Sequence, residues 1–356
     1  MMYSCSHPND TPHTQVRRTG RRIETVTVDI HCHLHAPEAD DLVPDKGQMA
    51  QESIVRFATE ETRAINQAML ADIRSRLVDP QVRIADMDRL GIDIQAISPN
   101  PFQYYYWTEP ELGRAVARSV NDRLAEVAAQ TPDRFVALGT VPLQHTDFAI
   151  AELERITSQL GMRGVEINTH INGEELSAER LRPFWAKAEE LNILVFLHPI
   201  GFTEGQRLGE HYLNNLIGQP LESSLAISQL IYGGVLENHP GLKICVPHGG
   251  GYLPMFSGRL DHAYHTRSDC RHGVSKEPSA YLKQLYFDTV VFSNEHLAHL
   301  VSLYGASQLL LGTDYPYDMG EPDAVGFVTR TPSLSDGQKQ AICGGNAMRL
   351  LGIGKT

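Results

Sequence analysis

Eight short, nearly continuous apolar segments recur along the chain, and each is followed by a segment with the pattern of a helix. The segments lie at about residues 25–30, 92–98, 135–141, 163–168, 193–198, 242–248, 285–289 and 308–314. Apolar runs of this kind are typical of strands in a parallel sheet that is covered on both faces. Eight such units in 356 residues predict an α/β fold, a (β/α)8 TIM barrel. A doubly wound open sheet is the alternative, but no Gly-x-Gly-x-x-Gly motif follows the first strand.

The chain divides into a short tail and one large domain. Residues 1–24 are polar and predict a flexible tail, and residues 25–356 make up the barrel. The segment 37–80 does not have the pattern of a simple crossover, because a Pro/Asp-rich piece precedes its helical stretch. We therefore expect a small insertion after the first strand, placed as a lid over the end of that strand.

Composition excludes several classes of partner. The formal net charge of -12 argues against nucleic acid and against a membrane surface. The sequence has no apolar run of 18 residues or more, so no transmembrane helix is expected. Its five cysteines are scattered and form no Cys-x-x-Cys pair, which indicates reduced thiols and a cytoplasmic protein.

Residues able to bind a metal stand where four of the predicted strands end. His31 and His33 follow the first strand, and their spacing of two places both side chains on one face. His198, His248 and Asp314 end the fifth, sixth and eighth strands. The carboxyl ends of barrel strands meet at one mouth, so these five side chains are expected to converge.

Three imidazoles and one carboxylate suit a single divalent metal, with Zn2+ as the first choice and Mn2+ or Fe2+ as alternatives. We assign His31, His33, His198 and Asp314 as its ligands. A catalytic metal of this kind lowers the pKa of a bound water to about 7. Asp314 could also accept a proton from that water, and His248 is predicted to be the general acid/base.

Four motifs resemble those of the amidohydrolase superfamily: His31-Cys-His33, Leu197-His198-Pro199, Pro247-His248-Gly-Gly-Gly251 and Gly312-Thr-Asp314-Tyr-Pro316. More narrowly, the chain from about residue 25 to its end is similar to the metal-dependent decarboxylase branch typified by the aminocarboxymuconate-semialdehyde decarboxylases. The resemblance implies a mononuclear metal enzyme that cleaves a carbon–carbon bond without net hydrolysis. Its substrate would be a small unsaturated or aromatic carboxylic acid. A first-position histidine favours this branch over the resorcylate-type decarboxylases, which typically have glutamate there.

Two other functions are weighed against this one. A metal-dependent hydrolase or hydratase of a lactone or unsaturated diacid would use the same motifs. A catalytically inactive barrel would be expected to have lost a ligand or the acid/base histidine, and all five positions are filled.

The resemblance also extends to substrate-binding arginines. Arg259 and Arg267 match arginines of the decarboxylase pattern, where one of them reaches the active site of a neighbouring subunit. This implies a homodimer in which Arg259 crosses the interface. The family's further arginine in the insertion has no clean match here, although Arg74 or Arg76 could replace it.

Other polar and aromatic residues near the strand ends allow two readings each. The loop from Phe102 to Trp107 could stack on a planar substrate or could be plain packing. Glu166, in the fourth strand, is expected to support the structure or a ligand rather than to bridge a second metal. His170, after that strand, could be a pocket residue, although we expect it to be solvated.

Overall fold

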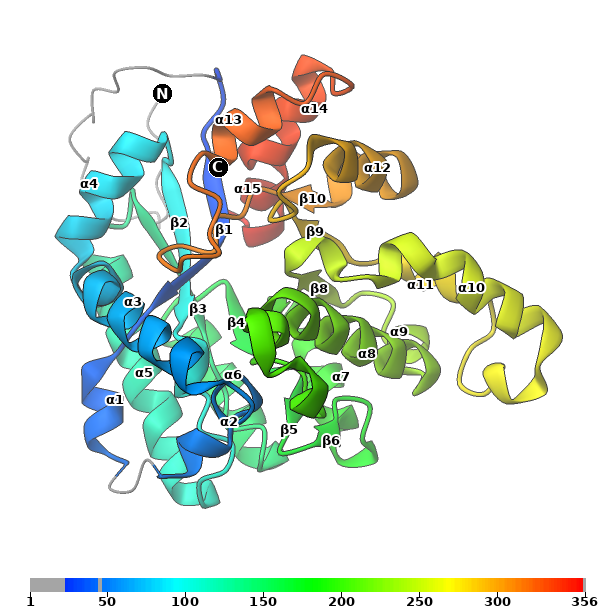
Figure 1. Ribbon diagram of the computed structural model, residues 1–356, viewed down its shortest axis with the longest axis horizontal. Helices are drawn as coiled ribbons and strands as arrows, with labels where there is room; N and C mark the ends of the chain where they lie inside the picture. Colours follow the sequence, from blue (N-terminus) through cyan, green and yellow to red (C-terminus); the bar gives the residue numbers. More distant parts are fainter. Residues whose placement is uncertain (1–22, 44–46, 355–356) are drawn as a thin grey trace.

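The computed structural model describes residues 23–43 and 47–354 and contains one eight-stranded parallel sheet (Figure 1). Its strands, in their order around the sheet, are β1 (Val28–Leu34), β2 (Ile94–Pro99), β3 (Phe135–Gly139), β4 (Gly164–Ile167), β7 (Leu194–Leu197), β8 (Lys243–Val246), β9 (Tyr286–Asp288) and β10 (Leu309–Leu310). The barrel closes where Ile30 N–H donates to the carbonyl of Leu311 at 2.8 Å and where Cys32 pairs with Tyr315. The predicted (β/α)8 TIM barrel is confirmed.

Helices follow the strands and surround the sheet (Figure 1). The longer ones are α3 (Glu60–Val78), α4 (Pro80–Leu90), α5 (Pro110–Gln130), α6 (Thr146–Ser158), α7 (Arg182–Glu190), α8 (Gln219–Tyr232), α10 (Leu253–Thr266) and α12 (Asn294–Tyr304). The shorter ones are α1 (Pro37–Asp41), α2 (Ser53–Arg56), α9 (Val235–Asn238), α11 (Pro278–Leu282), α13 (Ala324–Thr329), α14 (Asp336–Gln340) and α15 (Asn346–Leu351). Single turns are η1 (Gly47–Gln51), η2 (Pro101–Gln103), η3 (Glu179–Leu181), η4 (Gly205–Leu208), η5 (Glu210–Tyr212), η6 (Asn214–Gly218), η7 (His248–Gly250), η8 (Ser268–Cys270), η9 (Ala306–Gln308) and η10 (Ala341–Gly345).

The first strand is longer than the sequence indicated. We expected it to end at about residue 30, but β1 pairs with β2 as far as Leu34, which lies opposite Pro99. His31 and His33 therefore lie within the strand, where the backbone hydrogen bonds of the sheet hold them. The eighth strand is shorter than expected, because regular pairing with β9 covers only Leu309 and Leu310.

The segment between β1 and β2 contains α1, η1, α2, α3 and α4. The side chain of Thr59 caps α3 by accepting from Thr62 N–H, and Asp79 caps α4 by accepting from Gln81 N–H. The helix α4 ends at Gly91, whose φ of 72° lies in the left-handed region that glycine adopts without strain. The predicted tail, residues 1–24, falls outside the described residues except at its last two positions.

A small two-stranded hairpin was not anticipated from the sequence. It consists of β5 (His170–Ile171) and β6 (Glu174–Glu175), and it lies between β4 and α7. Strands of two residues leave too little periodicity to be recognised in a sequence.

Two clusters of buried apolar residues hold the barrel. The larger packs the strands against the surrounding helices, and the smaller joins residues of several strands to α15. The Phe196 ring of the smaller cluster lies 5.0 Å from the ring of His31. The interior of the barrel below His31 is therefore filled by packed apolar side chains. Among the described helices, none is both long enough and apolar enough to span a bilayer.

Gly344 permits a close approach between η10 and the start of β1. A Cβ atom at this position would lie 1.8 Å from the carbonyl oxygen of Val26, which is backbone and cannot move aside cheaply. We predict that Gly344→Ala lowers the free energy of unfolding by about 1–3 kcal/mol or more, the range typical of overpacking. Gly345→Ala is the control, because its nearest contact would be 3.6 Å away. Urea unfolding of both variants tests this, and equal stability would contradict the close approach.

Candidate functional site

His31 and His33 are each oriented by a hydrogen-bond acceptor behind the ring. The Nδ1 atom of His31 lies 2.6 Å from a carboxylate oxygen of Asp288, and that of His33 lies 3.0 Å from the carbonyl oxygen of Pro99. Since both partners are acceptors, each ring carries its proton on Nδ1. The Nε2 lone pairs are thereby directed toward the mouth of the barrel.

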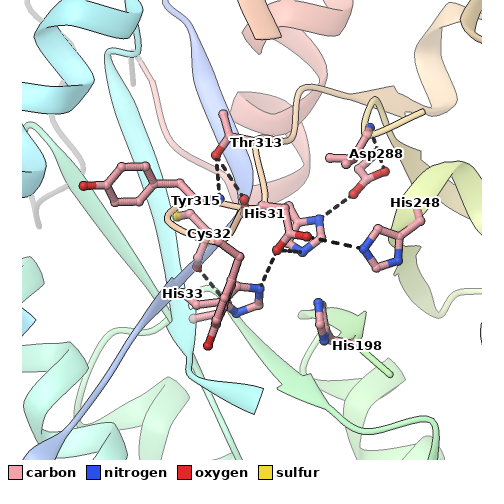
Figure 2. A network of polar contacts seen from close by, with 12 residues as sticks. His31, Cys32, His33, His198, His248, Asp288, Thr313 and Tyr315 are labelled. Atoms are coloured by element: carbon pink, nitrogen blue, oxygen red, sulfur yellow. Dashed lines mark hydrogen bonds and ion pairs between the residues drawn. The ribbon is translucent and has the colours of Figure 1, made fainter. Parts of the chain in front are cut away.

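Four residues meet at this mouth: His31, His33, His198 and Asp314. One potential ligand atom from each lies within 4.8 Å of the others, and all four residues are buried. Asp314 Oδ1 lies 3.2 Å from Nε2 of His31 and 3.3 Å from Nε2 of His33. Figure 2 shows His31 and His33 on one strand, with their rings close to that of His198.

The nitrogen atoms that face the centre lack hydrogen-bond partners. Nε2 of His31, Nε2 of His33 and both ring nitrogens of His198 are buried and make no hydrogen bond to a described residue. Buried polar atoms are rarely left unsatisfied, and such an exception calls for an explanation. A cation held by the lone pairs supplies one, and three imidazoles with one carboxylate are a donor set suited to a divalent metal. His31, His33, His198 and Asp314 are therefore a group that could hold a divalent metal ion.

The electrostatics of the site favour a positive charge. Burial would raise the pKa of Asp314, but His31, His248 and His33 face it and hold that pKa well below its ordinary value. Burial opposes a charge on His31, yet Asp314 and Asp288 raise its pKa well above the usual one. Burial and the neighbouring imidazoles lower the pKa of His198, which keeps its ring neutral and its lone pair available.

His248 lies beside this group rather than within it. Its Nε2 atom is 3.6 Å from Oδ2 of Asp314, the oxygen that does not face His31 and His33. His248 and Asp314 have φ values of 53° and 57°, in the left-handed region that residues other than glycine seldom occupy. Strained backbone of this kind is concentrated at functional sites, where the surrounding structure enforces it.

Glu166 supports the site from the fourth strand. Its carboxylate accepts hydrogen bonds from Ser98 and Tyr104, both at 2.6 Å, and lies 3.6 Å from Nδ1 of His33. Burial raises the pKa of this carboxyl, against the opposing effects of His33, Ser98 and Tyr104. Glu166 is not a member of the metal-binding group found among the described residues. The arrangement agrees with the expected supporting role.

Sequence reasoning missed two groups that orient the site, although each had a signal. Asp288 ends β9, at the same level of the barrel as the predicted ligands, and it binds both His31 and the backbone N–H of Gly249. Its place at the end of a barrel strand could have identified it. Tyr104 lies in the aromatic loop that was recognised, but the role of its hydroxyl depends on a partner in another strand.

A small cavity, called here the metal cavity, opens above this group. It has a volume of about 80 Å³ and is lined by His198 and Asp314, together with Phe102, Tyr212 and Tyr317. Helix α3 contributes further lining residues: Asn66, Met69 and Leu70. The metal cavity is therefore closed in part by the segment that follows β1.

The structure places the four predicted substrate-binding residues in different parts of the molecule. Phe102 lines the metal cavity, whereas Trp107 lines a neighbouring one. Arg259 and Arg267 lie exposed on α10 and at its end, away from the metal cavity of the same chain. Arg267 is paired with Asp269, with Nε 2.9 Å from Oδ1.

Neither candidate for the missing arginine reaches the metal cavity. Arg74 and Arg76 lie on α3 but do not line it. Arg76 instead pairs with Asp72 at 3.6 Å.

Comparison with known proteins identifies the family. A family model described as amidohydrolase matches residues 28–353. The chain belongs to the amidohydrolase family.

Its relatives include several named decarboxylases. This amidohydrolase is 33% identical to 2-amino-3-carboxymuconate-6-semialdehyde decarboxylase of Dictyostelium discoideum, over 92% of each chain. It is 29% identical to gamma-resorcylate decarboxylase of Rhodococcus jostii strain RHA1, over 69% of this chain and 80% of the relative. A crystal structure of 5-carboxyvanillate decarboxylase from Sphingomonas paucimobilis superimposes with a TM-score of 0.81 at 26% identity, covering 93% of this chain and 100% of that one.

The carboxylate behind His31 should control metal affinity. We predict that Asp288→Asn weakens metal binding by about 10- to 100-fold, because the ring loses the charged acceptor that makes it a better ligand. Chelator competition measures the dissociation constant, and circular dichroism checks the fold. Asp336→Asn, at an exposed position on α14, is the matched control. Unchanged affinity in Asp288→Asn would show that this carboxylate has no part in metal binding.

Proposed function

We propose that this amidohydrolase is a metal-dependent decarboxylase that acts on an aromatic or unsaturated carboxylic acid. The observation that carries the proposal is the group of three buried imidazoles with unsatisfied nitrogens, closed by Asp314 and flanked by His248. The relatives described above are decarboxylases, which favours carbon–carbon cleavage over hydrolysis.

In this proposal His31, His33, His198 and Asp314 hold one divalent metal. Zn2+ is the first choice for such a donor set, and Mn2+ and Fe2+ are the alternatives. A bound divalent cation would act as a Lewis acid that polarises an oxygen of the substrate. The low pKa of Asp314 keeps its carboxylate ionised for this purpose.

His248 is the proposed general acid/base. Asp314 Oδ2, 3.6 Å from His248 Nε2, would pair with the imidazolium form of His248 and keep the ring oriented. The imidazolium gives its proton to the substrate carbon that bears the carboxylate. The bond from that carbon to the carboxylate breaks, its electron pair returns to the carbon framework, and CO2 leaves. A proton thus replaces the carboxylate on one carbon atom of the substrate, and no water is added overall.

Helix α3 is proposed to act as a lid. It supplies Asn66, Met69 and Leu70 to the metal cavity and belongs to the segment predicted to cover the strand ends. A closed cavity excludes water, which strengthens the electrostatic interactions inside it.

A homodimer is proposed to complete the substrate site. Among the described residues that line the metal cavity, none is lysine or arginine, and a second copy of the chain could supply the second cation for the substrate. Arg259 lies on α10, which projects away from the strands (Figure 1) and also exposes Met255 (39%) and Phe256 (61%). Exposed apolar side chains of this size are typical of protein interfaces. We infer that Arg259 enters the metal cavity of a second copy.

A screen for CO2 release tests the activity. The metal-loaded protein should release CO2 from one or more aromatic or muconate-type carboxylic acids, and His248→Ala should lower kcat by about 10²–10⁴-fold, the usual contribution of an acid/base group. Metal content, measured by elemental analysis, should stay at one ion per chain in both proteins. Net addition of water without CO2, or full activity of His248→Ala, would contradict the proposed chemistry.

Mixed dimers test the shared site. Arg259→Ala should raise KM by at least tenfold, since a buried arginine–carboxylate contact contributes roughly 1.5–3 kcal/mol. Mixing it with a His198→Ala chain should restore part of the activity, because one site then has both an intact metal group and an intact arginine. Arg271→Ala, also exposed but beyond α10, is the control. Absence of restored activity in dimers shown to be mixed would argue against Arg259 crossing the interface.

A further inference from the structure

A second cavity lies beside the metal cavity and shares part of its wall. Its volume is about 270 Å³, compared with about 80 Å³ for the metal cavity. Pro101, Phe102 and Ile200 line both. Most of the remaining wall comes from η1 and α2, the loop after β2 and the β5–β6 hairpin. Helix α2 and the hairpin lie at the same end of the barrel (Figure 1). None of the four proposed metal ligands lines this second cavity.

Aromatic rings form one side of the second cavity. Tyr104 stacks on Tyr106 with ring centroids 5.6 Å apart, and Tyr105 meets Trp107 edge to face at 5.5 Å. The hydroxyls of Tyr104 and Tyr105 are engaged by Glu166 at 2.6 Å and Asp40 at 2.8 Å. The wall therefore offers ring surface, and ring faces attract cations.

Glu52 brings an uncompensated carboxyl to the same cavity. Its side chain makes no hydrogen bond or ion pair with any described residue, and burial raises its pKa to about 7. Arg56 also lines the cavity, but its guanidinium is exposed and lies over the ring of Phe57 at 5.1 Å. Glu52 is half-buried, so its carboxylate loses part of its hydration without gaining a partner, and a cationic ligand would offset that loss.

His170 does not supply the missing positive charge. The backbone N–H of Gly173 donates to its Nδ1 atom at 3.1 Å, so Nδ1 is an acceptor and Nε2 carries the only ring proton. Burial lowers the pKa of His170 to about 4, which keeps the ring neutral. Of the two alternatives for this residue, the structure matches the pocket residue, because half-buried His170 lines the second cavity.

We propose that the second cavity binds a small organic ammonium ion. Glu52 is its counter-ion, and the rings of Trp107 and Phe102 contact its apolar part. Because Phe102 also lines the metal cavity, the bound ion would be a neighbour of the substrate. The proposal does not depend on decarboxylation at the metal.

Trp107 provides a local signal for the test. It and Trp185 are the two tryptophans of the chain, and Trp185 is fully buried in α7 with its Nε1 donating to the carbonyl of Leu176. Benzylammonium should change the fluorescence of the metal-loaded protein at pH 8, and Trp107→Phe should abolish the change. Calorimetry should give at least tenfold tighter binding for benzylammonium than for benzyl alcohol, its uncharged counterpart.

Two variants test whether the carboxylate of Glu52 is the charge that favours benzylammonium over benzyl alcohol. Glu52→Gln should reduce the affinity for benzylammonium to that for benzyl alcohol, whereas Glu61→Gln, exposed on α3, should leave it unchanged. Equal affinity for the two probes in the unaltered protein would overturn the proposal. Displacement of benzylammonium by benzoate, with no effect of Glu52→Gln, would place the amine in the metal cavity and would also overturn it. Failure of the CO2 screen would leave these results unaffected.

Discussion

Closure of the barrel between β1 and the segment after β10 is the contact on which the metal site depends. Asp314 N–H donates to the carbonyl of His31 at 2.8 Å, which fixes the carboxylate against strand β1. Thr313 strengthens the same seam through its hydroxyl, which donates to Asp29 at 2.6 Å. The first and the last strand of the sheet thus meet at one point, where His31 and Asp314, far apart in the sequence, come within 3.2 Å of one another.

Groups outside the centre of the site orient the side chains that face it. Asp288 and the carbonyl of Pro99 hold the rings of His31 and His33 so that their lone pairs face inward. Glu166, held by Ser98 and Tyr104, adds a buried carboxyl behind His33. These contacts give the Nδ1 atoms of His31 and His33 defined partners, whereas both ring nitrogens of His198 make no hydrogen bond to a described residue.

The surroundings of the site divide into two chemically different spaces. The metal cavity is small, and its described lining has no lysine or arginine. The second cavity is larger, rich in aromatic rings and holds a carboxyl without a partner. Phe102 separates the two, which means that one loop after β2 shapes both environments.

The sequence by itself predicted the barrel, and it also predicted that His31, His33, His198 and Asp314 lie together. Each of three apolar runs predicts a parallel strand, and the residue that ends it, His198, His248 or Asp314, is predicted to lie at the carboxyl end of that strand. Only the tertiary structure decided which partners complete the site and where the aromatic loop points. Asp288, Glu166 and Glu52 act through contacts or burial that depend on strands and helices far apart in the chain, and such proximity has no local periodicity in the sequence. The placement of Trp107 and His170 in a second cavity follows from the folding of the β5–β6 hairpin against the loop after β2, which no short-range pattern encodes.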